Sequence, residues 1–155
     1  MSGPLALIPA WLILSYMHGS SAYGPALSLS IFVIVWAADV GAYLVGRTIG
    51  RVKLAPEISP GKTWEGAIGG LIAATIAAAL VATLLGLPLA VFVGVAAAAT
   101  MLSVVGDLTV SMFKRYVGVK DSGRLLPGHG GILDRIDSLC AAVPLLYAGL
   151  WITGV

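Results

Sequence analysis

The chain consists of long apolar runs separated by short polar segments. Four runs are close to the length of about 20 mostly apolar residues that a helix needs to cross a bilayer: residues 26–46, 67–85, 89 to about 113, and 139–155. The opening stretch, residues 4–17, is shorter and reaches across only together with residues 18–23. A cleaved signal peptide is the alternative for this stretch, but the basic residues that begin such peptides are missing. The pattern therefore predicts about five transmembrane helices, four of them clear.

The connections between the runs predict which polar segments meet. Gly86-Leu87-Pro88 is a minimal turn between two uncharged runs, so the two helices form a hairpin and their outer ends lie on one side. This brings residues 47–65 to the same side as the segment after Gly106. Both segments carry Lys and Arg, and such segments face the cytoplasm. The Gly- and Ala-rich runs suit close helix packing and are compatible with a homodimer.

Composition supports a membrane protein of one domain, residues 1–155. Hydrophobic residues make up 59% of the chain and charged residues only 10%, against about 25% charged in soluble domains. The fold class is therefore an all-α polytopic integral membrane bundle. The net charge is +2 and no Lys/Arg-rich run occurs, so nucleic-acid binding is not indicated. The single cysteine, Cys140, excludes an intrachain disulfide.

Acidic residues inside or beside the apolar runs are candidates for chemistry, because a carboxylate is costly at membrane depth. Asp39 and Asp107 lie within runs, toward the predicted cytoplasmic side. Asp134 and Asp137 are three residues apart and share a face of a helix that starts near Leu133. Asp107, Asp134 and Asp137 are expected to converge on one side of the membrane. Three such carboxylates predict a site for a hard cation, Mg²⁺ before Zn²⁺. The alternatives are pairing of the intramembrane acids with a nearby Arg, and a helix-capping role for the later pair.

Residues 59–65 form a second candidate, a segment for binding phosphate. A Gly-Lys-Thr step ends the phosphate loop of nucleotide-binding proteins, but Pro56 stands where that loop requires glycine. What remains is a basic segment at the start of a transmembrane helix, where backbone N–H groups and Lys62 can hold phosphate. The alternative, compatible with a site, is that Ser59 or Thr63 caps the helix.

The segment of residues 111–137 is the most informative part of the chain. A helix end with two cations leads into a glycine-rich polar loop that returns at the carboxylate pair. Cations gather around polyphosphates, glycines allow close backbone approach, and carboxylates hold a bridging metal. His129 lies between two glycines in this loop. Two interpretations of His129 are open: it contacts phosphate, or it is a loop histidine without a role in the chemistry.

This segment resembles the signature of the phosphatidate cytidylyltransferases, also called CDP-diacylglycerol synthases. It contains the family's Ser, Lys-Arg, Lys-Asp, His-Gly-Gly and Asp-Arg-x-Asp elements at the expected spacing. The resemblance extends upstream to Asp39-Val40-Gly41-Ala42-Tyr43, Lys53-Leu54-Ala55-Pro56, the segment of residues 59–66, and Gly106-Asp107. Family members usually carry several more N-terminal helices, so the chain is expected to be a shortened catalytic domain.

The resemblance implies transfer of CMP from CTP to phosphatidic acid, giving CDP-diacylglycerol and pyrophosphate. The expected location is a bacterial inner membrane, with the active site on its cytoplasmic face. Asp107, Asp134 and Asp137 would hold a catalytic Mg²⁺ with a second cation nearby. Lys114 and His129 would join them as catalytic residues. Substrate binding is expected from Asp39, Ser59, Lys62, Thr63, Ser111, Arg115, Lys120, Asp121 and Arg135.

Two other functions remain as alternatives. A cation transporter would line its path with intramembrane acids, but it would spread them through the depth of the bilayer, whereas here they cluster at one side. A catalytically silent scaffold would use the same polar segments to bind phospholipid headgroups only.

Overall fold

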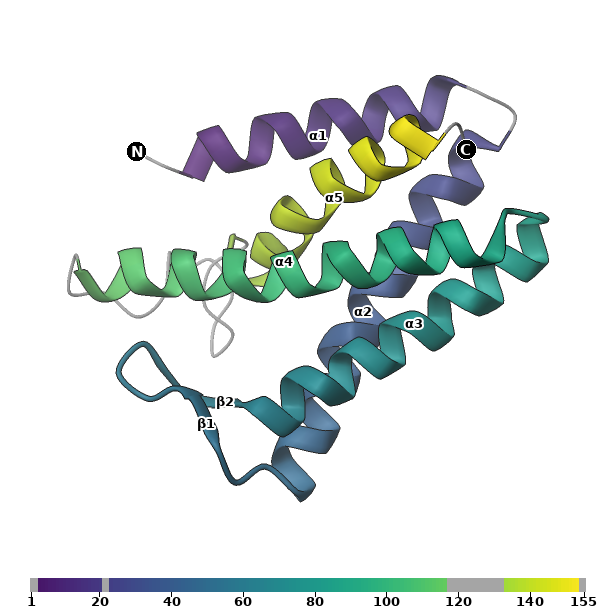
Figure 1. The fold of residues 1–155 in the computed structure, drawn as a ribbon. Helices are drawn as coiled ribbons and strands as arrows, with labels where there is room; N and C mark the ends of the chain where they lie inside the picture. Colours follow the sequence, from purple (N-terminus) through teal and green to yellow (C-terminus); the bar gives the residue numbers. More distant parts are fainter. Residues whose placement is uncertain (1–2, 21–22, 117–132, 154–155) are drawn as a thin grey trace.

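The described part of the chain folds into a bundle of helices with a small hairpin of strands (Figure 1). The computed structural model describes residues 3–20, 23–116 and 133–153; of these, residues 3–7, 20, 114, 133–137 and 153 are described by their backbone alone. The elements in this part of the chain are α1 (Gly3–Ser20), α2 (Gly24–Thr48), β1 (Lys53–Ala55), β2 (Ser59–Thr63), α3 (Trp64–Leu85), α4 (Leu89–Tyr116) and α5 (Leu133–Thr153).

Three of the described helices are long and apolar enough to cross a membrane: α2, α3, and α4 from Leu89 to Phe113. Large apolar side chains are exposed along the outside of the bundle, as expected of helices that face lipid instead of water. The prediction of an all-α integral membrane bundle is confirmed. The apolar part of α5, Ser138–Ile152, rises about 22 Å, so spanning by α5 and α1 stays a prediction.

The turn between α3 and α4 is the predicted hairpin. Gly86 ends α3 with φ of 67°, the left-handed conformation that glycine adopts without strain. Its backbone N–H donates to the carbonyl of Ala82, and the N–H of Leu87 donates to the same carbonyl at 2.9 Å. The start of α3 and the end of α4 consequently lie on one side of the bundle (Figure 1).

Helices α2 and α3 share the most extensive contact in the described bundle. Small residues recur every fourth position along the buried face of α3: Gly66, Gly70, Ala74, Ala78 and Ala82. A methyl group on Gly70 would lie 2.7 Å from the carbonyl oxygen of Ala38, so this approach requires glycine. Small residues at such crossings let helix backbones pack closely in lipid. The packing fixes the second half of α2 against the start of α3, where the polar side chains gather.

The remaining helices close the bundle around larger apolar side chains. Helix α5 packs on α4 and α1, and α1 also contacts α2. The largest fully buried side chains come from α2, α4 and α5: Ile31, Ile34, Phe92, Val143 and Leu146. This packing sets the start of α5 beside the middle of α2.

The hairpin of β1 and β2 is the main feature that the sequence does not predict. The strands are antiparallel, with Lys53 opposite Thr63 and Ala55 opposite Ser59. They have only three and five residues, too short to show an apolar alternation. The hairpin is joined to α3 through Val52, whose carbonyl accepts from the N–H of Trp64 at 2.9 Å. This bond fixes the orientation of the hairpin relative to the start of α3.

Candidate functional site

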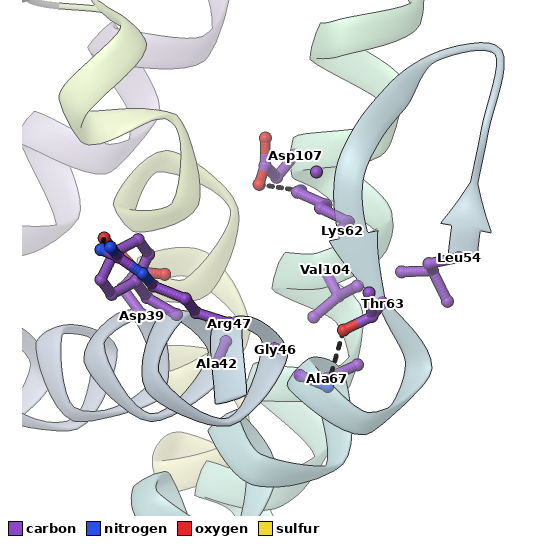
Figure 2. Close-up of a pocket in the computed structure, with 13 residues that line it drawn as sticks. Asp39, Ala42, Gly46, Arg47, Leu54, Lys62, Thr63, Ala67, Val104 and Asp107 are labelled. Atoms are coloured by element: carbon purple, nitrogen blue, oxygen red, sulfur yellow. Dashed lines mark hydrogen bonds and ion pairs between the residues drawn. The ribbon is translucent and has the colours of Figure 1, made fainter. Parts of the chain in front are cut away.

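A cavity of about 450 Å³ lies where α2, the hairpin, the start of α3 and α4 meet. Figure 2 shows charged side chains reaching it from different elements. Its lining is formed by Asp39, Ala42, Tyr43, Gly46, Arg47, Leu54, Gly61, Lys62, Thr63, Gly66, Ala67, Val104 and Asp107. Of the residues that the sequence singles out, Asp39, Lys62, Thr63 and Asp107 are brought together here.

Lys62 and Asp107 form an ion pair across this cavity (Figure 2). The lysine is on β2 and the aspartate on α4, 45 residues later in the chain. Their side chains are 29% and 28% exposed, so both remain reachable by a ligand. The hairpin turn at Gly86 makes this contact feasible, because it returns α4 to the side where β2 lies. The predicted phosphate segment and the predicted metal ligand thus share one site.

Thr63 combines the two roles that the sequence left open for the phosphate segment. Its hydroxyl accepts from the N–H of Gly66 at 3.1 Å, which makes Thr63 the N-cap of α3. The same residue lines the cavity. The capping interpretation is confirmed for Thr63, and capping holds it at the cavity wall. Ser59 lies at the start of β2, outside the residues that line the cavity.

A smaller cavity of about 40 Å³ adjoins the first and contains both intramembrane acids. Here Ser138 of α5 donates to Oδ2 of Asp39 at 3.2 Å. Because α5 begins at Leu133, this bond places the start of α5 at the site, and the predicted helix start is confirmed. The side chains of Asp134 and Asp137 lie outside the described part of the chain.

The end of α4 contributes two further contacts. The hydroxyl of Ser111 lies 3.5 Å from Oδ1 of Asp107, one helical turn earlier. Nε of Arg115 donates to the carbonyl of Ile58 at 3.2 Å, which ties the end of α4 to the hairpin. Ser111 is therefore near the predicted metal ligand, whereas the described contact of Arg115 is to the protein backbone.

Several predicted site residues cannot be placed in this way. Lys120, Asp121 and His129 lie outside the described residues, and so do the side chains of Lys114 and Arg135. Among the described residues, no group of three His, Cys, Asp or Glu side chains could hold a metal ion. The roles of these residues stay predictions.

Three residues at the site were missed from the sequence: Tyr43, Arg47 and Ser138. Nη1 of Arg47 donates to the hydroxyl of Tyr43 at 2.6 Å, and the guanidinium carbon lies 5.8 Å from the ring centroid. The available signal was their spacing of four residues, which stacks side chains on one helix face. For Ser138 the signal was its place directly after the two carboxylates at the start of α5.

Fold and site together define a helical integral membrane protein with a cavity whose described lining includes two acids and two cations. Comparison with known proteins gives the family. The profile of the cytidylyltransferase family matches residues 3–153. The chain therefore belongs to the cytidylyltransferase family, as the motifs indicate.

Curated relatives share high identity with the chain. A phosphatidate cytidylyltransferase of Pseudomonas aeruginosa is 50% identical over 164 residues, covering 98% of this chain and 57% of the relative. One of Haemophilus influenzae is 56% identical over 128 residues, covering 79% and 44%. One of Staphylococcus aureus strain COL is 50% identical over 120 residues, covering 76% and 46%. The chain spans about half the length of the curated relatives it matches.

Proposed function

We propose that the chain is the catalytic domain of a phosphatidate cytidylyltransferase, which transfers CMP from CTP to phosphatidic acid and releases pyrophosphate. The observation that carries this proposal is the pairing of Lys62 with Asp107 inside the cavity. A lysine that can hold phosphate meets a carboxylate that can hold a metal, in a chain that belongs to the cytidylyltransferase family. The proposed location is a bacterial inner membrane, with this end of the bundle at the cytoplasmic face, because the Lys and Arg residues gather there.

The chemistry asks for positioning and charge neutralisation more than for a base. An oxygen of the lipid phosphate forms a bond to the α-phosphorus of CTP. The bond from that phosphorus to the bridging oxygen of the β-phosphate breaks, and pyrophosphate leaves with the electron pair. Because the attacking phosphate is already an anion, no proton has to be removed from it. Lys62 supplies positive charge where the phosphates meet, and Asp107 holds its ammonium group in place.

A divalent cation fits the oxygen donors that the site presents. Asp39 and Asp107 line adjoining cavities, and the hydroxyl of Ser111 lies near Asp107. Oxygen donors of this kind are the ligands that Mg²⁺ prefers. We propose that Asp107 holds Mg²⁺ with Asp134 and Asp137 from the start of α5, with a second cation nearby. When bound, the metal would neutralise and orient the phosphates.

The remaining predicted residues fall into two groups. Asp39, Ser59, Thr63, Ser111 and Arg115 belong to the elements around the cavity, and we propose that they shape the nucleotide and phosphate site. The others are proposed to complete it with side chains that lie outside the described part of the chain: Lys114, Lys120, Asp121, His129 and Arg135.

The test is release of pyrophosphate by the purified protein with CTP, phosphatidic acid and Mg²⁺. Wild type should release pyrophosphate, and Asp107→Asn should lose about 100-fold or more of the rate. Glu57→Gln is the matched control, since Glu57 is exposed in the hairpin turn and does not line the cavity. Its rate should match wild type.

Other outcomes would separate the alternative functions. Absence of turnover in wild type, with phosphatidic acid still bound, would indicate a headgroup-binding scaffold. Cation flux through liposomes that disappears in Asp39→Asn would indicate a transporter. Equal turnover by wild type and Asp134→Asn would refute the assignment of Asp134 to the metal site even with the reaction established.

A further inference from the structure

We propose that Arg47, oriented by Tyr43, binds the phosphate group of the lipid substrate on the α2 side of the cavity. This inference rests on the proposed function, and it assigns a role to two residues that the motifs leave without one. Both residues line the cavity. Figure 2 shows Arg47 extending from α2 away from the Lys62–Asp107 pair, so the two cations of the cavity lie apart.

The contacts of Arg47 leave most of its hydrogen-bonding capacity for a ligand. Its described contacts are the hydroxyl and ring of Tyr43, one turn earlier on the same helix. These contacts hold the guanidinium over the ring without neutralising its charge. Within the described part of the chain, the one ion pair is that of Lys62 with Asp107. A guanidinium has five N–H donors in a planar fork that matches two oxygens of a phosphate.

The surface of α2 leading to Arg47 suits a lipid. Exposed apolar side chains follow alternating steps of three and four residues along this helix, which places them on one stripe: Leu29, Val33, Trp36, Val40 and Tyr43. Arg47 continues the same spacing and is itself exposed. A stripe that is apolar along the membrane span and cationic at its end is complementary to a molecule with acyl chains and an anionic headgroup. Phosphatidic acid is such a molecule, whereas CTP is not.

The separation of the two cations also suits the proposed reaction. The attacking and leaving oxygens of a phosphoryl-type transfer lie roughly in line on opposite sides of the phosphorus. A nucleotide held at Lys62 and a lipid phosphate held at Arg47 would approach each other from opposite sides of the cavity. Lys62 on one side and Arg47 on the other therefore give the arrangement that the attack requires.

A simpler role for Arg47 makes a different prediction. A basic residue in the last turn of a helix interacts favourably with the helix dipole and anchors the helix at the membrane surface. Arg51 provides the comparison, because it is the same residue type four positions later, exposed, and outside the cavity lining. Arg51 lies beyond Thr48, where α2 ends. If Arg47 only anchors α2, its loss should leave ligand binding unchanged, as loss of Arg51 should.

The experiment measures binding by titration calorimetry on the purified protein in detergent. The ligands are dioctanoyl phosphatidic acid, dioctanoyl phosphatidylcholine, glycerol 3-phosphate, and CTP with Mg²⁺. Arg47→Ala should weaken phosphatidic acid binding about tenfold and leave CTP binding unchanged. Arg47→Lys should restore part of the loss, and Arg51→Ala should bind phosphatidic acid as wild type does. Circular dichroism melting checks that each variant is folded.

Each result decides for or against the proposal. Unchanged phosphatidic acid binding in Arg47→Ala would overturn it, as would an equal loss of CTP binding. Tight, Arg47-dependent binding of glycerol 3-phosphate would show a site for free phosphate and overturn the lipid assignment. Arg47-dependent lipid binding in a protein without turnover would support the subsite and refute the proposed function. Turnover by wild type, together with normal lipid binding by Arg47→Ala, would support the proposed function and refute the subsite.

Discussion

The two sides of the cavity hold their charges in different ways. On the side of the hairpin and α4, residues far apart in the chain are cross-linked: Lys62 pairs with Asp107, and Arg115 donates to the carbonyl of Ile58. On the α2 side, Arg47 contacts only its neighbour one turn away, Tyr43, among the interactions described for it. The cations of the first side are fixed by tertiary contacts. On the α2 side, among the described contacts, only Asp39 has such a contact, to Ser138, and Arg47 presents an unneutralised charge at the helix surface.

This difference suggests how the two substrates are handled. A fixed pair suits the nucleotide, whose α-phosphorus has to be held still during attack. An exposed cation at the end of an apolar stripe suits a lipid that has to enter from the side of the bilayer. Variants that disturb one side should therefore affect mainly one substrate. The loss of activity should be larger for a side chain that joins two elements of the fold than for one that contacts only its own helix.

The largest effect is expected for Lys62→Ala. Loss of the ammonium group removes positive charge at the phosphates and leaves the Asp107 carboxylate without its partner. We expect kcat/KM for CTP to fall about 10²- to 10³-fold. The value of kcat/KM is obtained from steady-state rates of pyrophosphate release at varied CTP concentration. Lys53→Ala is the control, since Lys53 is exposed on the adjacent strand and outside the cavity. A fall shared by both variants would show an effect of net charge instead.

An intermediate effect is expected for Glu65→Ala. Both carboxylate oxygens of Glu65 accept from the backbone N–H of Val52, each 3.2 Å from its nitrogen. Glu65 therefore holds the hairpin that carries Lys62. We expect kcat to fall about tenfold, with KM for phosphatidic acid unchanged. Glu65→Gln keeps an acceptor and should recover most of the rate. Failure of Glu65→Gln to recover it would show that the charge itself is needed, not the position of the hairpin.

The smallest effect is expected for Tyr43→Phe. This change removes the hydroxyl that accepts from Arg47 but keeps the ring beneath the guanidinium. Loss of one such bond should raise KM for phosphatidic acid about threefold, with kcat and KM for CTP unchanged. Kinetics at varied lipid fraction in mixed micelles give these constants. Tyr23→Phe, at the opposite end of α2, serves as the control. A change in KM for CTP alone would reverse the assignment of the two sides.

Much of the fold could be predicted because membrane helices depend on simple patterns. Runs of apolar residues locate α2, α3 and α4, since backbone groups in lipid must be satisfied within the helix. Gly86 marks the turn because its conformation suits glycine. The strand hairpin escaped prediction because it depends on tertiary bonds, such as those of Val52 with Glu65 and Trp64.

The site could be predicted where residue type alone indicates chemistry. Asp39, Asp107 and Lys62 stand out because charge is rare in an apolar chain, and the structure brings all three to adjoining cavities. Arg47 is also a rare charge, but its role, like that of Ser138, depends on how α2 and α5 are rotated in the bundle. Helix rotation follows from side-chain packing, which a single sequence does not show.

The most direct measurement follows the phosphorus atoms of CTP. The purified protein is incubated with phosphatidic acid, Mg²⁺, and CTP labelled at either the α- or the γ-phosphate, and the lipid is then extracted. The proposed function predicts label in the lipid from the α-position only, with all γ-label recovered in water as pyrophosphate, and no transfer by Asp107→Asn. Label in the lipid from the γ-position, or from neither position, would contradict it.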